Sequence, residues 1–176
     1  MKSKTISSIA VVLFIFFGLF IWGYSGRGVG AGATTASVQG VPGATGTTES
    51  ALASQEVFYD FGTISMKDGN VTKEFVVTNP TDGDITVRTI LTSCMCTTAF
   101  IVKPDGGTKG PFSMAGMGYV PPANEVIKAG ESRVIRVVYD PNAHGPAGIG
   151  RIDRFVMLTD SGGGTLELEI KALVTP

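Results

Sequence analysis

The chain has 176 residues, of which 43% are hydrophobic, and its formal net charge is −1. Its 14 basic residues are dispersed among 15 acidic ones, whereas binding to a phosphate backbone needs clustered lysine and arginine, so we exclude a nucleic-acid partner. The length left after a hydrophobic N-terminal segment and a glycine-rich stretch fits one domain that can fold without metals or disulfides.

An apolar segment over residues 6–24 predicts a transmembrane helix, because its length approaches the roughly 20 residues that cross a bilayer. Lys2 and Lys4 lie in residues 1–5, which the positive-inside rule places in the cytoplasm. The chain after the segment is then extracytoplasmic, so we expect a single-pass cell-membrane protein. The side chains expected to anchor it in the bilayer are Ile9, Phe14, Phe16, Phe17, Phe20 and Trp22.

A cleaved signal peptide is the alternative interpretation of this segment. Its apolar centre is short for an anchor, and the small residues of Ala31-Gly32-Ala33 resemble a cleavage site, although they lie rather far beyond Trp22. Both interpretations send the folded part of the chain out of the cytoplasm.

Residues 25–55 consist mostly of glycine, alanine, threonine and serine, and their only charged side chains are Arg27 and Glu49. Such a composition cannot bury enough apolar surface to become ordered. We therefore expect a disordered linker, and a glycine-rich coil of this length reaches on the order of 30 Å.

From residue 56 to residue 176 the chain alternates short β-branched and aromatic runs with turn residues, which is typical of a β-sandwich. The clearest alternation is in the last run, where Leu166, Leu168, Ile170, Ala172 and Val174 share one face. The segment between Val102 and Glu125 does not follow this spacing. Because long irregular loops are often functional, we regard it as a candidate contact surface.

Residues 56–176 contain five motifs, which are Phe58–Ile64, Phe75–Asn79, Thr92–Thr97, Ile127–Ser132 and Val137–Pro141. Taken together, these motifs resemble the bacterial DUF1573 family, and the resemblance covers residues 56–176. It implies an immunoglobulin-like antiparallel β-sandwich related to domains of ciliary and centrosomal proteins, exported, often membrane-anchored and without an established catalytic activity. Met95 stands where the family more often has glycine, and the insertion after Val102 is longer than in the simplest members.

Cys94 and Cys96 are the only cysteines, and in an extended strand residues two apart point to the same face. A disulfide fits the oxidising exterior, although so small a ring strains the geometry. A soft metal ion such as Cu(I) also fits two thiolates, with Met114, Met117 or His144 as further ligands. The third interpretation is that both cysteines are small buried apolar residues.

We expect no enzymatic activity, because the chain has a single histidine, His144, and no serine or cysteine in a nucleophile setting to accompany it. We interpret His144 as a solvated turn residue. The predicted function is that of a membrane-anchored binding or structural module of the cell envelope, with a protein or cell-wall partner and no cofactor. The alternative is an extracytoplasmic thiol or copper-binding protein that uses the Cys94/Cys96 pair.

Overall fold

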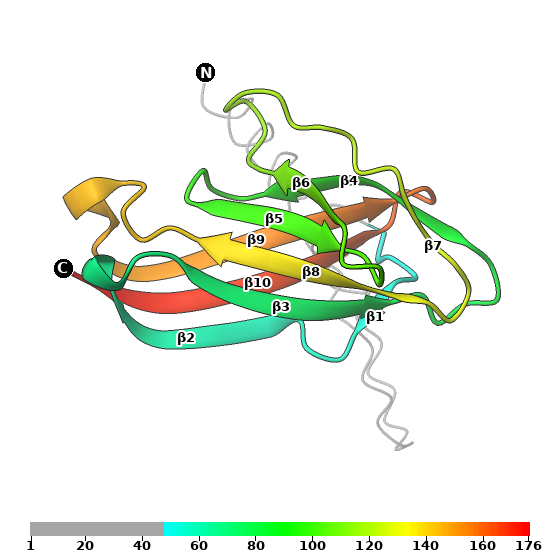
Figure 1. Cartoon of the computed structure of the whole chain (residues 1–176), viewed down its shortest axis with the longest axis horizontal. Coiled ribbons are helices and arrows are strands. Elements are labelled where there is room, and N and C mark those ends of the chain that lie inside the picture. The colour runs from blue at the N-terminus through cyan, green and yellow to red at the C-terminus, as the bar shows by residue number, and fades with distance from the viewer. Residues whose placement is uncertain (1–47) are drawn as a thin grey trace, which may run out of the picture. The chain divides into compact units, whose positions relative to one another are not determined.

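Two five-stranded sheets packed face to face make up residues 48–176, the part of the chain that this computed structural model describes (Figure 1). One sheet has the order β1-β3-β8-β5-β6, with bounds Ala53–Ser54, Val71–Thr78, Ser132–Tyr139, Thr97–Val102 and Thr108–Phe112. The other has the order β2-β10-β9-β4-β7, with bounds Phe58–Ser65, Thr165–Thr175, Gly150–Asp160, Ile85–Thr92 and Glu125–Ile127. Two 3-10 turns complete the fold, η1 (Met66–Asp68) and η2 (Gly145–Gly148).

The core lies between the sheets and is built from alternate residues of the strands. In β10 the side chains of Leu168, Ile170, Ala172 and Val174 are buried while their neighbours are exposed or half-buried, as the sequence alternation predicts. The same period places Phe75 of β3 inside. Burial of such side chains stabilises the fold by about 25 cal/mol per Å² of apolar surface. The expectation of an all-β sandwich is confirmed.

The sheets are not purely antiparallel, which corrects the expected strand arrangement. β2 pairs parallel with β10, with Tyr59 opposite Ile170 and Ile64 opposite Val174. The chain leaves β2 through η1 and continues into β3 of the opposite sheet. β2 therefore has no hairpin partner and pairs with the C-terminal strand.

The sandwich begins earlier than the composition predicts, because residues 48–55 are part of it. Leu52 is 3% exposed, and β1 pairs with β3. The backbone N–H of Ser50 donates to the carbonyl of Thr165. The composition of this segment does not reveal that it pairs with residues far along the chain. The linker prediction for residues 25–55 is therefore wrong over residues 48–55.

The predictions of a transmembrane helix over residues 6–24 and of a cleavage site at residues 31–33 fall outside the described residues. Within residues 48–176, no helix combines the length and the apolar character that a membrane span requires.

The segment between Val102 and Glu125 is more ordered than expected. β6 extends the sheet beside β5, and β7 pairs with β4, which leaves residues 113–124 as the irregular part. Glu125 at the start of β7 is buried, and its carboxylate lies 2.9 Å from Arg133 Nε, 3.6 Å from Lys109 Nζ and 4.0 Å from Lys103 Nζ. These cations compensate the buried charge and attach the segment to the sandwich.

Candidate functional site

The two cysteines lie in a turn that carries the chain from β4 in one sheet to β5 in the other. The N–H of Thr97 donates to the carbonyl of Cys94 at 3.1 Å. The buried hydroxyl of Thr92 lies 3.0 Å from the carbonyl oxygens of both Cys94 and Thr97. The expected extended conformation is therefore wrong, because a chain that changes sheets must bend.

Hydrogen bonds to both sheets hold this turn in place. The N–H of Asp140, just after β8, donates to the carbonyl of Cys96 at 2.9 Å. The N–H of Ser93 donates to the carbonyl of Phe155 in β9, and the N–H of Phe155 donates to the hydroxyl of Ser93. The turn is thus a fixed platform for the two sulfurs.

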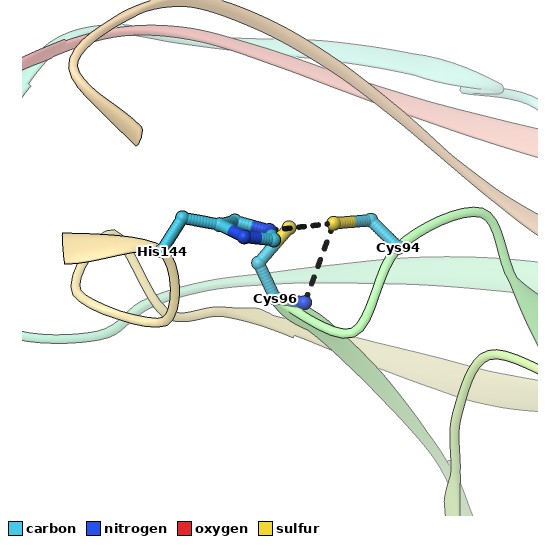
Figure 2. Close-up of side chains that lie close together, drawn as sticks. All are labelled: Cys94, Cys96 and His144. Atoms are coloured by element: carbon cyan, nitrogen blue, oxygen red, sulfur yellow. Dashed lines mark hydrogen bonds between the residues drawn. The ribbon is translucent and has the colours of Figure 1, made fainter. Parts of the chain in front are cut away.

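His144 reaches the cysteines from the loop between β8 and β9. It is exposed and precedes η2, and its side chain makes no capping hydrogen bond there. Its Nε2 lies 3.1 Å from Cys94 Sγ, and Figure 2 shows the ring and this sulfur directed toward each other. The two sulfurs and a ring nitrogen of His144 all lie within 4.8 Å of one another. His144 is the solvated turn residue that the sequence predicts, and it also completes a cluster of soft donors.

The two cysteines differ in exposure, although both are free thiols in the structure. Cys96 is 2% exposed and belongs to the core, so the interpretation as a small buried apolar residue fits its packing. Cys94 is half-buried at the edge of the core. The sulfur of Cys94 is therefore accessible to reagents and ligands, whereas the sulfur of Cys96 is enclosed.

The pKa of Cys94 is lowered from 9.0 to about 7. Burial, the largest single effect, raises it, while hydrogen bonds from the side chain and the backbone N–H of Cys96 lower it. His144 and the positive charge of Arg154 lower it further. At neutral pH a large fraction of Cys94 is therefore the thiolate, which is the form that acts as a nucleophile and a metal ligand.

Cys96 titrates after Cys94. Its pKa is raised, first because its sulfur is buried and then because its thiol donates to Cys94, although the guanidinium of Arg154 opposes the rise. The pair thus loses its first proton from the exposed sulfur.

Arg154 is the site residue that sequence reasoning missed. Its Nε donates to Cys96 Sγ at 3.2 Å from an inward-facing position of β9, between the buried Ile152 and Val156. A charged residue in the apolar phase of a strand is a signal that the sequence contains. Its partner could not be inferred, because Cys96 lies 58 positions away and local pattern does not show that β4, which precedes the cysteine turn, pairs with β9.

Of the five residues predicted as metal ligands, the structure brings Cys94, Cys96 and His144 together. Met114 and Met117 lie in the loop between β6 and β7, where Met114 is half-buried and Met117 is exposed. Their role as ligands stays a prediction. The donors present suit a soft ion, because thiolate sulfur and imidazole nitrogen bind Cu(I) and Zn²⁺ in preference to hard cations.

The search of protein-family models gives no match for this chain. The search of curated proteins gives no match either. Among solved structures, a protein of unknown function from Porphyromonas gingivalis is similar, with 15% sequence identity and a TM-score of 0.51 over 75% of this chain. This chain spans 50% of the length of that protein.

Two further structures are more distant. The secreted serine protease VesC from Vibrio cholerae has 15% identity and a TM-score of 0.44, with 71% of this chain and 24% of that chain covered. The PapD-like domain 7 of human CEP192 has 12% identity and a TM-score of 0.43, with 82% and 98% covered. The likeness to the Porphyromonas structure concerns the fold alone. The chain is an all-β protein whose described residues form a sandwich of two packed five-stranded sheets.

Proposed function

We propose that the chain is a membrane-anchored, extracytoplasmic binding module of the cell envelope and not an enzyme. The apolar segment over residues 6–24 after Lys2 and Lys4 supports an anchor with its N-terminus in the cytoplasm. The glycine-rich residues 25–47 form the tether in this proposal. The motif resemblance supports membership of the DUF1573 family, whose members are usually exported and often membrane-anchored.

The proposed absence of catalysis depends on what surrounds the thiols. Cys94 and His144 lie in hydrogen-bond contact, as a nucleophile and its base would. However, a second sulfur occupies the same cluster. A surface cavity of about 440 Å³ lies instead on β2, β9 and β10, beside Asp60 and Lys171, and none of the cluster residues lines it. These observations support binding at the thiols in preference to acyl transfer.

Membrane fractionation and intact mass of the full chain test the anchor. We expect the chain in the membrane fraction after a high-salt and alkaline wash, with a mass that includes residues 1–33. Digestion of intact spheroplasts by an added protease should degrade the sandwich. A soluble product whose mass begins after Ala33 would contradict the anchor, and protection of the sandwich from the protease would contradict the orientation.

The cluster of two sulfurs and one imidazole nitrogen within 4.8 Å favours a specific form of this function, which is the binding of Cu(I). Soft thiolate ligands select Cu(I), and three donors on fixed backbone segments are already close together. Cys94 and Cys96 supply the thiolates, and His144 supplies the imidazole. The Cys94/Cys96 disulfide is the oxidised form that would compete with the metal.

Copper binding is tested by anaerobic titration of the full chain with Cu(I), in detergent and in the presence of a competing chelator. The Cys94→Ser/Cys96→Ser variant should lose the tight site, and His144→Ala should bind more weakly. Met114→Leu/Met117→Leu is the matched variant for the methionines, and retained affinity in it would remove them from the ligand set. Equal affinity of the wild type and the double serine variant would contradict a copper site.

A further inference from the structure

We propose that Arg154 makes the Cys94–Cys96–His144 site selective for a monovalent soft cation, Cu(I), over divalent Zn²⁺. This inference depends on the metal-binding form of the proposed function. It assigns a specificity role to a residue that is not itself a ligand.

The guanidinium of Arg154 is half-buried beside the cysteine turn and has an unusual partner. Its Nε donates to Cys96 Sγ at 3.2 Å, and its Nη1 donates to the carbonyl of Asp153 at 2.8 Å. Within residues 48–176, Arg133 and Arg136 form ion pairs with carboxylates, whereas Arg154 forms none. A half-buried cation needs a compensating anion. The sulfur pair is the anion that this position provides.

Charge balance then distinguishes the two metals. Two thiolates and a neutral imidazole carry a charge of −2, so Cu(I) gives a loaded cluster of −1 and Zn²⁺ gives a neutral one. With Arg154 beside the cluster the copper site is neutral, whereas the zinc site retains an uncompensated positive charge. Loading with Zn²⁺ thus places one more positive charge beside the guanidinium than loading with Cu(I), and the arginine disfavours zinc relative to copper because charges interact strongly in a partly buried environment.

The number of donors favours the same metal. Zn²⁺ in protein sites is almost always four-coordinate and tetrahedral, so three protein donors leave one of its positions to water. Cu(I) is satisfied by fewer ligands, and thiolates are its preferred ones. The exposed side of the cluster is occupied by the His144 ring, while Arg154 approaches the inner sulfur. The arginine therefore acts on the charge of the site without occupying a coordination position.

The role of Arg154 is tested by the affinities of full-chain variants for Cu(I) and for Zn²⁺. Each affinity is measured in detergent at one pH with a competing chelator. In Arg154→Gln we expect the ratio of the Cu(I) affinity to the Zn²⁺ affinity to fall by about tenfold or more, the order of one charge interaction near a protein surface. The affinity for Zn²⁺ should stay the same or rise. Arg154→Lys keeps the charge and should keep the ratio of the two affinities within a few-fold.

Arg136→Gln is the matched control, because Arg136 pairs with Glu74 on the exposed face of the sheet and should not affect either metal. If Arg154→Gln does not fold, Arg154→Met supplies an uncharged apolar replacement. An unchanged ratio of affinities, or an equal loss for both metals in the glutamine variant, would overturn the role of Arg154. Failure of the wild type to bind Cu(I) more tightly than Cys94→Ser/Cys96→Ser would instead overturn the copper site itself.

Discussion

His144 Nε2 and Cys94 Sγ lie 3.1 Å apart, although 50 positions of the chain separate the two residues. The loop after β8 supplies the histidine, and the turn between the sheets supplies the thiol. The hydrogen bond from Asp140 to the carbonyl of Cys96 joins these two segments a few residues from the contact. The properties of Cys94 therefore depend on a loop that is distant in sequence.

Alkylation of Cys94 should follow the thiolate and increase with pH around a midpoint of about 7. The pKa is lowered although burial opposes ionisation, because Cys96, His144 and Arg154 stabilise the thiolate. Cys96 should react more slowly and only at higher pH. Iodoacetamide labelling of the reduced chain at a series of pH values, with the two cysteines resolved by tandem mass spectrometry, measures both rates.

His144→Ala should move the midpoint for Cys94 upward, toward the ordinary value of 9.0, because the variant lacks one of the hydrogen bonds to the thiolate. Arg136→Gln, far from the cluster on the exposed face of β8, should leave it unchanged. A midpoint near 9 in the wild-type chain would show that the surrounding groups do not stabilise the Cys94 thiolate.

Thr92→Val should loosen the cysteine turn. The substitution keeps the size of a fully buried side chain but removes the hydroxyl beside the carbonyl oxygens of Cys94 and Thr97. Loss of this buried hydrogen bond should lower the free energy of unfolding by about 1–3 kcal/mol. Chemical denaturation measures the change, and the Cys94 alkylation midpoint should shift with it.

Thr98→Val is the control for this substitution, because Thr98 is half-buried in β5. Its replacement should change the free energy of unfolding by less than about 0.5 kcal/mol. Equal effects of the two substitutions would mean that the Thr92 hydroxyl does not stabilise the turn.

Glu125→Gln should destabilise the sandwich strongly. The buried carboxylate pairs with Arg133 and lies near Lys103 and Lys109. Its neutralisation removes the counter-charge that the three cations share and leaves Arg133 only its pair with Glu131. Breaking a buried pair in this way costs about 3–5 kcal/mol. Denaturant unfolding measures the loss, and Glu74→Gln serves as control because its pair with Arg136 is exposed and should contribute less than about 1 kcal/mol.

Gly164→Ala should destabilise the attachment of the N-terminal segment. A Cβ at this position would lie 2.6 Å from Ser50 Cα and 2.8 Å from the carbonyl oxygen of Glu49, so backbone must move. We expect a loss of about 1–3 kcal/mol in the free energy of unfolding. Gly83→Ala has open space and should have a small effect, and hydrogen exchange of residues 48–54 should become faster only in the Gly164 variant.

The sequence predicts those parts of the fold that depend on local alternation. The period in Leu166 to Val174 identifies β10 and its buried face correctly, because side chains of a strand alternate whatever their partners are. The parallel partner β2 and the contribution of Leu52 depend on pairing between distant segments, which local pattern does not contain.

The candidate site was predictable in its residue types and not in its geometry. Two cysteines and a single histidine are evident as soft donors, but only the fold shows that His144 reaches Cys94. Arg154 was missed for a related reason. Its contact with Cys96 requires the position of β9 relative to the turn, and strand pattern alone identifies neither sulfur as its counter-ion.

The chain enters the sandwich at one end of β9, where the hydroxyl of Ser50 donates to the carboxylate of Asp160. Arg154 lies six positions earlier on the same strand, a separation of about 20 Å at roughly 3.3 Å per residue. The sulfur cluster is therefore remote from the attachment point of the N-terminal segment. A protein that exchanges an ion with the proposed site would therefore bind well away from Ser50 and would leave the contacts of residues 48–54 with the sandwich intact.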